Sequence, residues 1–246
     1  MLFVCSPEDC KTETMTSAYN VVCVKAGPKY GPDYVNKLYS MCRRHITLPF
    51  RFVCLTDDVT GVDDGIECLP LPDPQFKGVW HKLSVFRPRL YDITGRILMI
   101  DVDVVIVDNM DGFLTLPGSF CINLDWNAET PTLQGSIYRL EAGSLPHVYE
   151  RLAATYPDSC APYRGEQGWL TANIKEWTTW PDGWSVSYKK HCDRWRWFPS
   201  RVPKGAKIVN FHGIPNPPDA LRGHWTGKKG ELVRRPRARW IAKHWR

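Results

Sequence analysis

An apolar run that ends in two acidic residues places the strongest constraint on this chain. Residues 97–100 read Ile-Leu-Met-Ile, Asp101-Val102-Asp103 follows, and residues 104–107 are apolar again. Residues i and i+2 of a strand point to the same side, so both carboxylates can project together from the strand's end. Two carboxylates this close raise each other's pKa unless a cation lies between them. The pattern predicts either a divalent-cation site built from oxygen ligands or a solvated acidic turn.

Strand and helix patterns alternate along the first half of the chain. The sequence predicts strands at 19–24, 51–55, 65–69, 97–100, 119–123, 136–140 and 207–211, and helices at 33–44, 80–90, 145–156 and 166–173. Because this alternation favours a parallel sheet, we expect one α/β domain with a mostly parallel central sheet flanked by helices. Ligands of such sheets bind at the carboxyl ends of the strands, which is where Asp101 and Asp103 fall.

Composition divides the chain into three parts. We expect a loose, polar N-terminal extension at residues 1–18, a domain at 19–219 and a basic, tryptophan-containing segment at 220–246. The nine cysteines are scattered without a C-x-x-C pair, which favours a reducing compartment and a cytoplasmic location. No apolar run approaches the roughly 20 residues that a membrane span needs.

The C-terminal segment carries much of the net charge of +6 and contains Trp225, Trp240 and Trp245. Trp240, Ile241 and Trp245 fall on one side of a short predicted helix, which could pack on the domain. The same helix could instead contact a membrane surface or a lipid-linked acceptor, because tryptophan together with lysine and arginine suits such an interface. Nucleic acid is a third partner for a basic segment, and we do not expect it.

Five short segments occur in a characteristic order: residues 21–26, Trp80-His81-Lys82-Leu83, Asp101-Val102-Asp103, Gly165-Glu166-Gln167-Gly168 and Asn210-Phe211-His212-Gly213. Together they resemble GT-A fold glycosyltransferases, in particular the retaining family 8 that includes glycogenin and bacterial galactosyltransferases. The resemblance covers roughly residues 19–219. It implies a Rossmann-like domain that moves a sugar, with retention, from a nucleotide-sugar donor (most often a UDP-sugar) to a glycan or lipid-linked acceptor.

The resemblance also implies roles for individual residues. Asp101, Asp103 and His212 would hold Mn²⁺ (or Mg²⁺), and a mixed set of imidazole and carboxylates suits Mn²⁺. Glu166 and Gln167 would be catalytic, at a place where the family usually has Asp-Gln. The residues implied to contact the donor or its metal are Val24, Lys25, Ala26, Lys82, Asp101, Val102, Asp103, Gln134 and Gly213.

One position departs from the family pattern. The late motif usually continues into a Lys-Pro that contacts the diphosphate, whereas Asn216 stands near the place of that lysine. Arg222 or Lys228 could supply the missing charge. Without the resemblance, Lys82 reads as an exposed helix lysine and His212 as a turn histidine.

Two other functions stay open at this point. A sugar nucleotidyltransferase would use similar acidic chemistry, but it normally carries a Gly-rich basic loop after the first strand, and residues 25–29 supply only a faint version. A non-enzymatic basic and aromatic binding module would explain the C-terminal segment but not the paired carboxylates.

Overall fold

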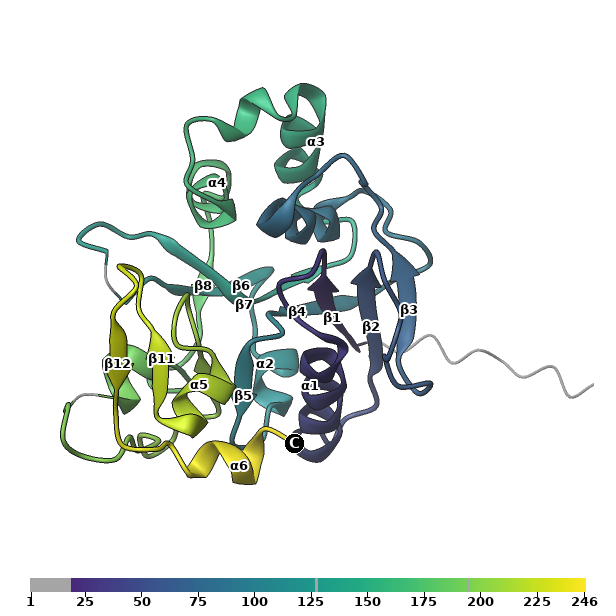
Figure 1. The fold of residues 1–246 in the computed structure, drawn as a ribbon. Coiled ribbons are helices and arrows are strands. Elements are labelled where there is room, and N and C mark those ends of the chain that lie inside the picture. The colour runs from purple at the N-terminus through teal and green to yellow at the C-terminus, as the bar shows by residue number, and fades with distance from the viewer. Residues whose placement is uncertain (1–18, 127, 194) are drawn as a thin grey trace, which may run out of the picture.

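The computed structural model is organised around a seven-stranded mixed sheet (Figure 1). It describes residues 19–126, 128–193 and 195–246, so the predicted extension at 1–18 lies outside the described residues. The strands of this sheet are β1 (Tyr19–Lys25), β2 (Arg51–Thr56), β3 (Glu67–Pro70), β4 (Arg96–Ile100), β6 (Phe120–Leu124), β7 (Leu133–Glu141) and β8 (Thr178–Thr179). Their order is β3-β2-β1-β4-β7-β6-β8, and only β7 runs antiparallel to its neighbours. The predicted α/β domain with a mostly parallel central sheet is confirmed.

A second, three-stranded sheet lies beside the first. It is formed by β5 (Val104–Ile106), β9 (Ser185–Ser187) and β10 (Ile208–Asn210), with β10 in the middle. A hairpin of β11 (His224–Thr226) and β12 (Leu232–Arg234) follows near the C-terminus. Since β4 belongs to the large sheet and β5 to the small one, the chain passes between the two sheets at residues 101–103.

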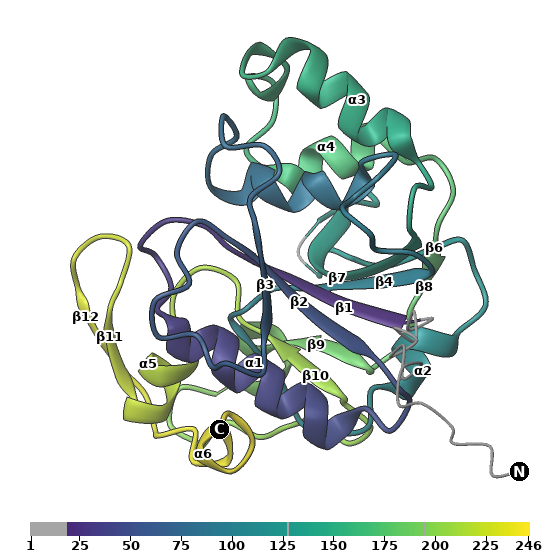
Figure 2. The ribbon, with the colours of Figure 1, turned by 90° about the vertical axis from the view of Figure 1, so that its right-hand side faces the viewer.

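Helical elements cover both faces of the central sheet, as Figures 1 and 2 show. One side holds α1 (Pro32–His45), α2 (Asp111–Thr115), α5 (Pro217–Arg222) and α6 (Trp240–His244). The other side holds the 3₁₀ helix η1 (Gly78–Phe86), α3 (Pro146–Thr155) and α4 (Glu166–Asn173). Two short helical turns, η2 (Asp158–Cys160) and η3 (Tyr188–Cys192), complete the described elements.

Strand β1 shows why the sheet is covered on both faces. Val21 and Cys23 pack in the apolar core on the α1 side, whereas Val22 between them packs in the core on the η1 side. Successive side chains of a strand point to opposite faces, so a strand that is apolar at every position requires cover on both. This burial holds the carboxyl ends of β1 and β4 in fixed positions.

The predicted helix at 80–90 differs from the observed element, because η1 ends at Phe86. Arg87 adopts an extended conformation with ψ of 143°. The residue before a proline is excluded from the helical region by the proline ring, and Pro88 has no backbone N–H to continue the hydrogen-bond pattern. The proline therefore ends the helix before residues 87–90 of the predicted range.

The C-terminal segment packs into the core on the α1 side. Ile241 is fully buried and Trp245 is 5% exposed, and the Trp245 indole meets the Tyr34 ring edge-on at 5.3 Å between centroids. Arg44 of α1 donates hydrogen bonds to the carbonyl oxygens of His244 and Arg246, each at 2.6 Å. The packed-helix alternative therefore describes the position of α6.

We predict that Trp245→Ala lowers the free energy of unfolding by about 3 kcal/mol, because it leaves a cavity between α6 and α1. Trp197→Ala is the matched control, since the Trp197 side chain is 79% exposed. Chemical denaturation of both variants is the measurement. Equal stability of the two variants would contradict the packing of α6.

Candidate functional site

The two acidic residues lie in a turn at the junction of the two sheets. Asp101 directly follows β4, and Asp103 directly precedes β5. The backbone N–H of Asp101 donates to the carbonyl oxygen of Ser136 on β7 at 2.9 Å, which ties the turn to the antiparallel strand. Asp103 is 6% exposed, so it is not part of a solvated turn.

Lys82 of η1 is paired with two carboxylates. Its ammonium lies 2.8 Å from Asp101 Oδ1 and 2.7 Å from Glu166 Oε1 at the start of α4. Lys82 is only 6% exposed, so the reading of this residue as an exposed helix lysine is wrong. The three charges come from η1, the turn after β4 and the start of α4, and they meet at the carboxyl end of β4.

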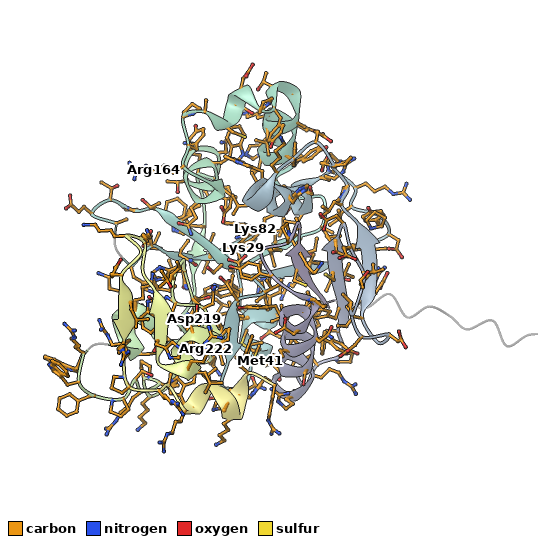
Figure 3. The ribbon with its side chains drawn as sticks, in the orientation of Figure 1. Lys29, Met41, Lys82, Arg164, Asp219 and Arg222 are labelled. Atoms are coloured by element: carbon orange, nitrogen blue, oxygen red, sulfur yellow. The ribbon has the colours of Figure 1, made fainter. Side chains whose placement is uncertain are left out.

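Asp103 is held by a residue that the sequence pattern did not single out. The Tyr30 hydroxyl donates to Asp103 Oδ2 at 2.6 Å. Lys29 precedes it, with its ammonium 4.5 Å from the Tyr30 ring centroid. Figure 3 shows Lys29 and Lys82 near each other at the centre of the molecule.

Burial dominates the protonation of these groups. Burial raises the pKa of Asp101 to about 7; Lys82 opposes this shift, while the negative charges of Asp103 and Glu166 add to it. Burial also raises the pKa of Asp103, although Tyr30 and Lys29 act in the opposite direction. Burial on its own would lower the pKa of Lys82, but its two carboxylate neighbours outweigh this effect and raise it. Additional positive charge at this place would therefore stabilise the ionised carboxylates.

A cavity of about 320 Å³ brings most of the predicted residues together. Its lining includes Val24, Ala26, Lys82, Asp101, Val102, Asp103, Glu166, Gln167, His212 and Gly213. Two predicted residues are not part of the lining. Lys25 donates from its ammonium to the carbonyl oxygen of Asp58 at 3.0 Å, and Gln134 donates to the hydroxyl of Ser136 at 2.6 Å. Ser136 lines the cavity in place of Gln134.

His212 reaches the cavity from the end of β10. Its Nε2 lies 2.6 Å from the Ser187 hydroxyl, and its ring stacks on Trp126 with 6.0 Å between centroids. Burial, together with the nearby positive charge of Lys189, lowers the pKa of His212, which keeps the imidazole neutral at pH 7. Within residues 19–126, 128–193 and 195–246, no three His, Cys, Asp or Glu side chains are close enough together to form a metal site as they stand.

The two residues predicted to be catalytic approach the cavity across β7. Gly135 on that strand has no side chain, and a Cβ there would lie 3.1 Å from Glu166 Oε1 and 3.6 Å from Gln167 Cγ. A larger residue at this position would crowd the Glu166 carboxylate, which would have to shift by a few tenths of an ångström. Gly135 therefore leaves room for the Glu166 carboxylate that contacts Lys82.

A larger cavity of about 910 Å³ adjoins the first and shares Ala26 and Gly78 with it. It lies over the carboxyl ends of β1, β2 and β3, and Asp57 holds its rim by accepting from the backbone N–H of Gly27 at 2.9 Å. His81 also lines it, and the buried Nδ1 of His81 has no hydrogen-bond partner among the described residues. A volume of this order accommodates a nucleoside-sized ligand.

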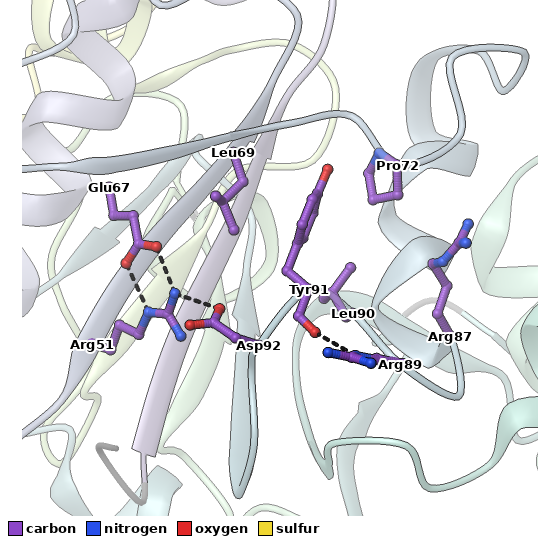
Figure 4. Close-up of a pocket in the computed structure, with 9 residues that line it drawn as sticks. All are labelled: Arg51, Glu67, Leu69, Pro72, Arg87, Arg89, Leu90, Tyr91 and Asp92. Carbon is purple, nitrogen blue, oxygen red and sulfur yellow. Dashed lines mark hydrogen bonds and ion pairs between the residues drawn. The ribbon is translucent and has the colours of Figure 1, made fainter. Parts of the chain in front are cut away.

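A further cavity of about 800 Å³ opens beside β2 and β3, but its charges are already paired (Figure 4). Arg51 contacts Glu67 at 2.5 Å and Asp92 at 2.8 Å, and Arg89 donates to the carbonyl oxygen of Tyr91 at 3.2 Å. None of the predicted site residues lines it. We therefore place the candidate site in the two adjoining cavities.

Tyr30, Lys29 and His81 are the functional candidates that sequence reasoning did not identify by role. Tyr30 and Lys29 follow Gly27-Pro28, a turn signal at the carboxyl end of the first strand, where ligands of parallel sheets bind. Their position directly after this turn was the sequence signal that could have identified them as ligand-contacting residues. His81 stands next to Lys82 in a segment that was singled out for the lysine alone.

We predict that Lys82→Met lowers the free energy of unfolding by about 3–5 kcal/mol, because it leaves Asp101 and Glu166 buried without a counter-charge. The loss should be largest above pH 7 and smaller at pH 5, because the raised pKa of Asp101, about 7, lets this carboxyl retain its proton there. Lys204→Met, at an exposed lysine, is the control. Adding Glu166→Gln to Lys82→Met should restore part of the stability. A pH-independent loss equal to that of the control would contradict the buried ion pairs.

No protein-family pattern and no curated protein matches this sequence. Solved structures do resemble it. The glycosyltransferase GlyE of Streptococcus pneumoniae TIGR4 superposes with a TM-score of 0.60 at 12% identity, over 81% of this chain and 56% of GlyE. The galactosyltransferase LgtC, solved with donor and acceptor sugar analogues, has a TM-score of 0.61 at 9% identity, over 91% of this chain and 94% of LgtC. This chain therefore has the GT-A fold of these glycosyltransferases.

Proposed function

We propose that this protein is a glycosyltransferase that moves a sugar from a nucleotide-sugar donor, a UDP-sugar, to an acceptor with retention at the anomeric carbon. One observation carries the proposal. A single cavity at the carboxyl ends of β1 and β4 is lined by Lys82, Asp101, Asp103, Glu166 and His212, in the fold that GlyE and LgtC share. In open α/β sheets this end of the strands is where ligands bind.

A divalent cation, Mn²⁺ or Mg²⁺, fits the chemistry of this cavity. Asp101 and Asp103 are buried carboxyls whose pKa values are raised, and His212 is neutral and hence able to act as a ligand. These three residues would hold the ion, with carboxylate and imidazole ligands that suit Mn²⁺. When bound, the ion neutralises the negative charge that a departing diphosphate accumulates.

The donor's nucleoside would occupy the larger adjoining cavity, which lies over the ends of β1–β3. His81 lines this cavity, and its buried Nδ1, which has no partner among the described residues, would pair with a polar ligand atom that reaches it. The shared residues Ala26 and Gly78 mark the passage to the carboxylates. This arrangement would place the diphosphate beside Asp101 and Asp103 and the sugar toward Glu166 and Gln167.

Glu166 and Gln167 would stabilise the sugar as its anomeric carbon gains positive character. Glu166 is held by Lys82, which fixes its carboxylate and also shares its charge with Asp101. A carboxylate so restrained is suited to electrostatic stabilisation of a cationic centre. Gln167 also lines this cavity and would add its amide oxygen to that stabilisation.

Two lysines could replace the charge that the family's late lysine supplies. Lys29 lines the cavity, and Lys189 donates to the carbonyl oxygen of His212 at 2.7 Å. Of the two residues that the sequence suggested for this role, Arg222 is paired with Asp219 on α5, and Lys228 is exposed on the β11–β12 hairpin. We therefore assign stabilisation of the leaving group to Lys29 and Lys189.

We also propose that the acceptor is a glycan or a lipid-linked sugar and that the protein acts in the cytoplasm. In the part of the chain that the structure describes, no helix is long and apolar enough to cross a membrane. The C-terminal segment, predicted to contact a membrane peripherally, keeps exposed basic residues on a helix whose apolar side is buried.

We expect Asp103→Asn to reduce metal-dependent release of nucleoside diphosphate from the preferred nucleotide sugar by at least about 100-fold, because it removes a ligand charge. A panel of nucleotide sugars with Mn²⁺ or Mg²⁺ identifies the donor, and Asp182→Asn, at an exposed aspartate, is the control. Normal turnover of the Asp103 variant at saturating metal would remove this residue from the site. Release of pyrophosphate from a nucleoside triphosphate and a sugar phosphate would instead identify a nucleotidyltransferase.

We expect His212→Ala to weaken Mn²⁺ binding in the presence of UDP by at least about tenfold. Isothermal titration calorimetry is the measurement. His224→Ala is the control, because His224 is exposed on the β11–β12 hairpin. Unchanged Mn²⁺ and UDP affinities would show that His212 is a structural partner of Ser187 only.

A further inference from the structure

The loop at residues 193–200 exposes three large aromatic side chains. Trp195 is 67% exposed, Trp197 79% and Phe198 67%. The loop lies at the lower left edge of the molecule in Figure 1. Isolated apolar residues are common at protein surfaces, but three exposed rings within four residues of one loop concentrate apolar surface there, which is typical of an interaction site.

The base of this loop is fixed. The backbone N–H of Arg201 donates to the carbonyl oxygen of Cys192 at 3.1 Å and closes the loop. Asp193 is paired with Arg235 at 3.5 Å, and Ser200 accepts from the Trp240 indole N–H at 3.1 Å. Cys192 and Ser200 are buried. The fold therefore holds both ends of the loop and presents the aromatic tip outward.

Positive charge surrounds the tip. Residues 190–204 carry Lys190, Arg194, Arg196, Arg201 and Lys204, against the single acid Asp193. Of the described members of this group, Lys190, Arg196, Arg201 and Lys204 are exposed, whereas Asp193 is already paired with Arg235. The Arg196 guanidinium lies 5.2 Å from the Trp197 ring centroid, so charge and aromatic surface are presented together. A partner that complements this surface has an apolar layer that accepts the rings and anionic groups that pair with the basic side chains.

The C-terminal segment does not offer the same combination. Trp245 is 5% exposed, and Trp240 packs toward Tyr188 and Ser200. Its exposed residues are mainly cations, which attract an anionic surface but cannot insert into it. Among residues 220–246 the exposed large apolar side chain is Leu232, so the exposed rings suited to insertion are those of the 193–200 loop.

We propose that Trp195, Trp197 and Phe198 insert into the interface of an anionic lipid bilayer while Arg196 and Arg201 contact the lipid phosphates. Tryptophan rings favour the boundary between headgroups and acyl chains, and each basic residue near an anionic surface adds to the attraction. Because it rests on exposed side chains away from the candidate cavity, the inference is independent of the reaction performed there.

The test is sedimentation of the full chain with vesicles of phosphatidylcholine, with and without one third phosphatidylserine. We expect binding to the anionic vesicles. Trp195→Ala/Trp197→Ala/Phe198→Ala should lower the partition coefficient by at least about tenfold. Arg196→Gln and Arg201→Gln should each lower it about fivefold on anionic vesicles. None of these changes should alter the melting temperature or UDP binding.

Trp177→Ala/Leu232→Ala is the matched control, because it removes exposed apolar surface elsewhere. The proposal is overturned if the intact chain does not bind anionic vesicles, or if the triple variant binds as the intact chain does. It is equally overturned if Lys243→Gln/Arg246→Gln abolishes binding while the triple variant retains it, which would place the contact on α6. Concentration-dependent dimerisation that the triple variant abolishes, without vesicle binding, would identify a second copy as the partner.

Discussion

The buried contact of Lys82 with Asp101 and Glu166 is the interaction on which the candidate site depends. It joins η1, the end of β4 and the start of α4, which are distant in sequence. Buried charges cost free energy unless they are paired, so each element is held in the position that keeps the others paired. The contact also fixes two of the three carboxylates that line the cavity, because Lys82 pairs with Asp101 and Glu166, while the Tyr30 hydroxyl donates to Asp103.

The crossing between the two sheets explains why the acidic pair lies beside a ligand-sized space. β4 ends in the seven-stranded sheet, and β5 begins in the three-stranded one, whose middle strand β10 leads to His212. The chain thereby brings Asp103 and His212 to the same cavity from positions more than 100 residues apart. Three carboxylates there face two lysines, Lys29 and Lys82, and this balance favours a cation when an anionic diphosphate approaches.

Much of the fold could be predicted from local patterns, because strands such as 97–100 are apolar at every position and are followed by polar turns. The ends of helices and strands were harder to predict where a single residue determines the end, as Pro88 does for η1. The position of Tyr30 after the Gly27-Pro28 turn was visible in the sequence, but its contact with Asp103 depends on the tertiary arrangement. The tryptophans make the same point. Trp245 and Trp197 both stand among basic residues, yet one is buried against α1 and the other is 79% exposed.

The central claim is that the two adjoining cavities bind a nucleotide sugar through Asp101, Asp103 and His212. Anomalous diffraction from crystals grown with Mn²⁺ and UDP tests it most directly. The account predicts one manganese peak about 2.2 Å from an Asp103 oxygen and a His212 nitrogen, with the uridine beside His81. A peak elsewhere, or UDP in the cavity beside Arg51 and Tyr91, would contradict it.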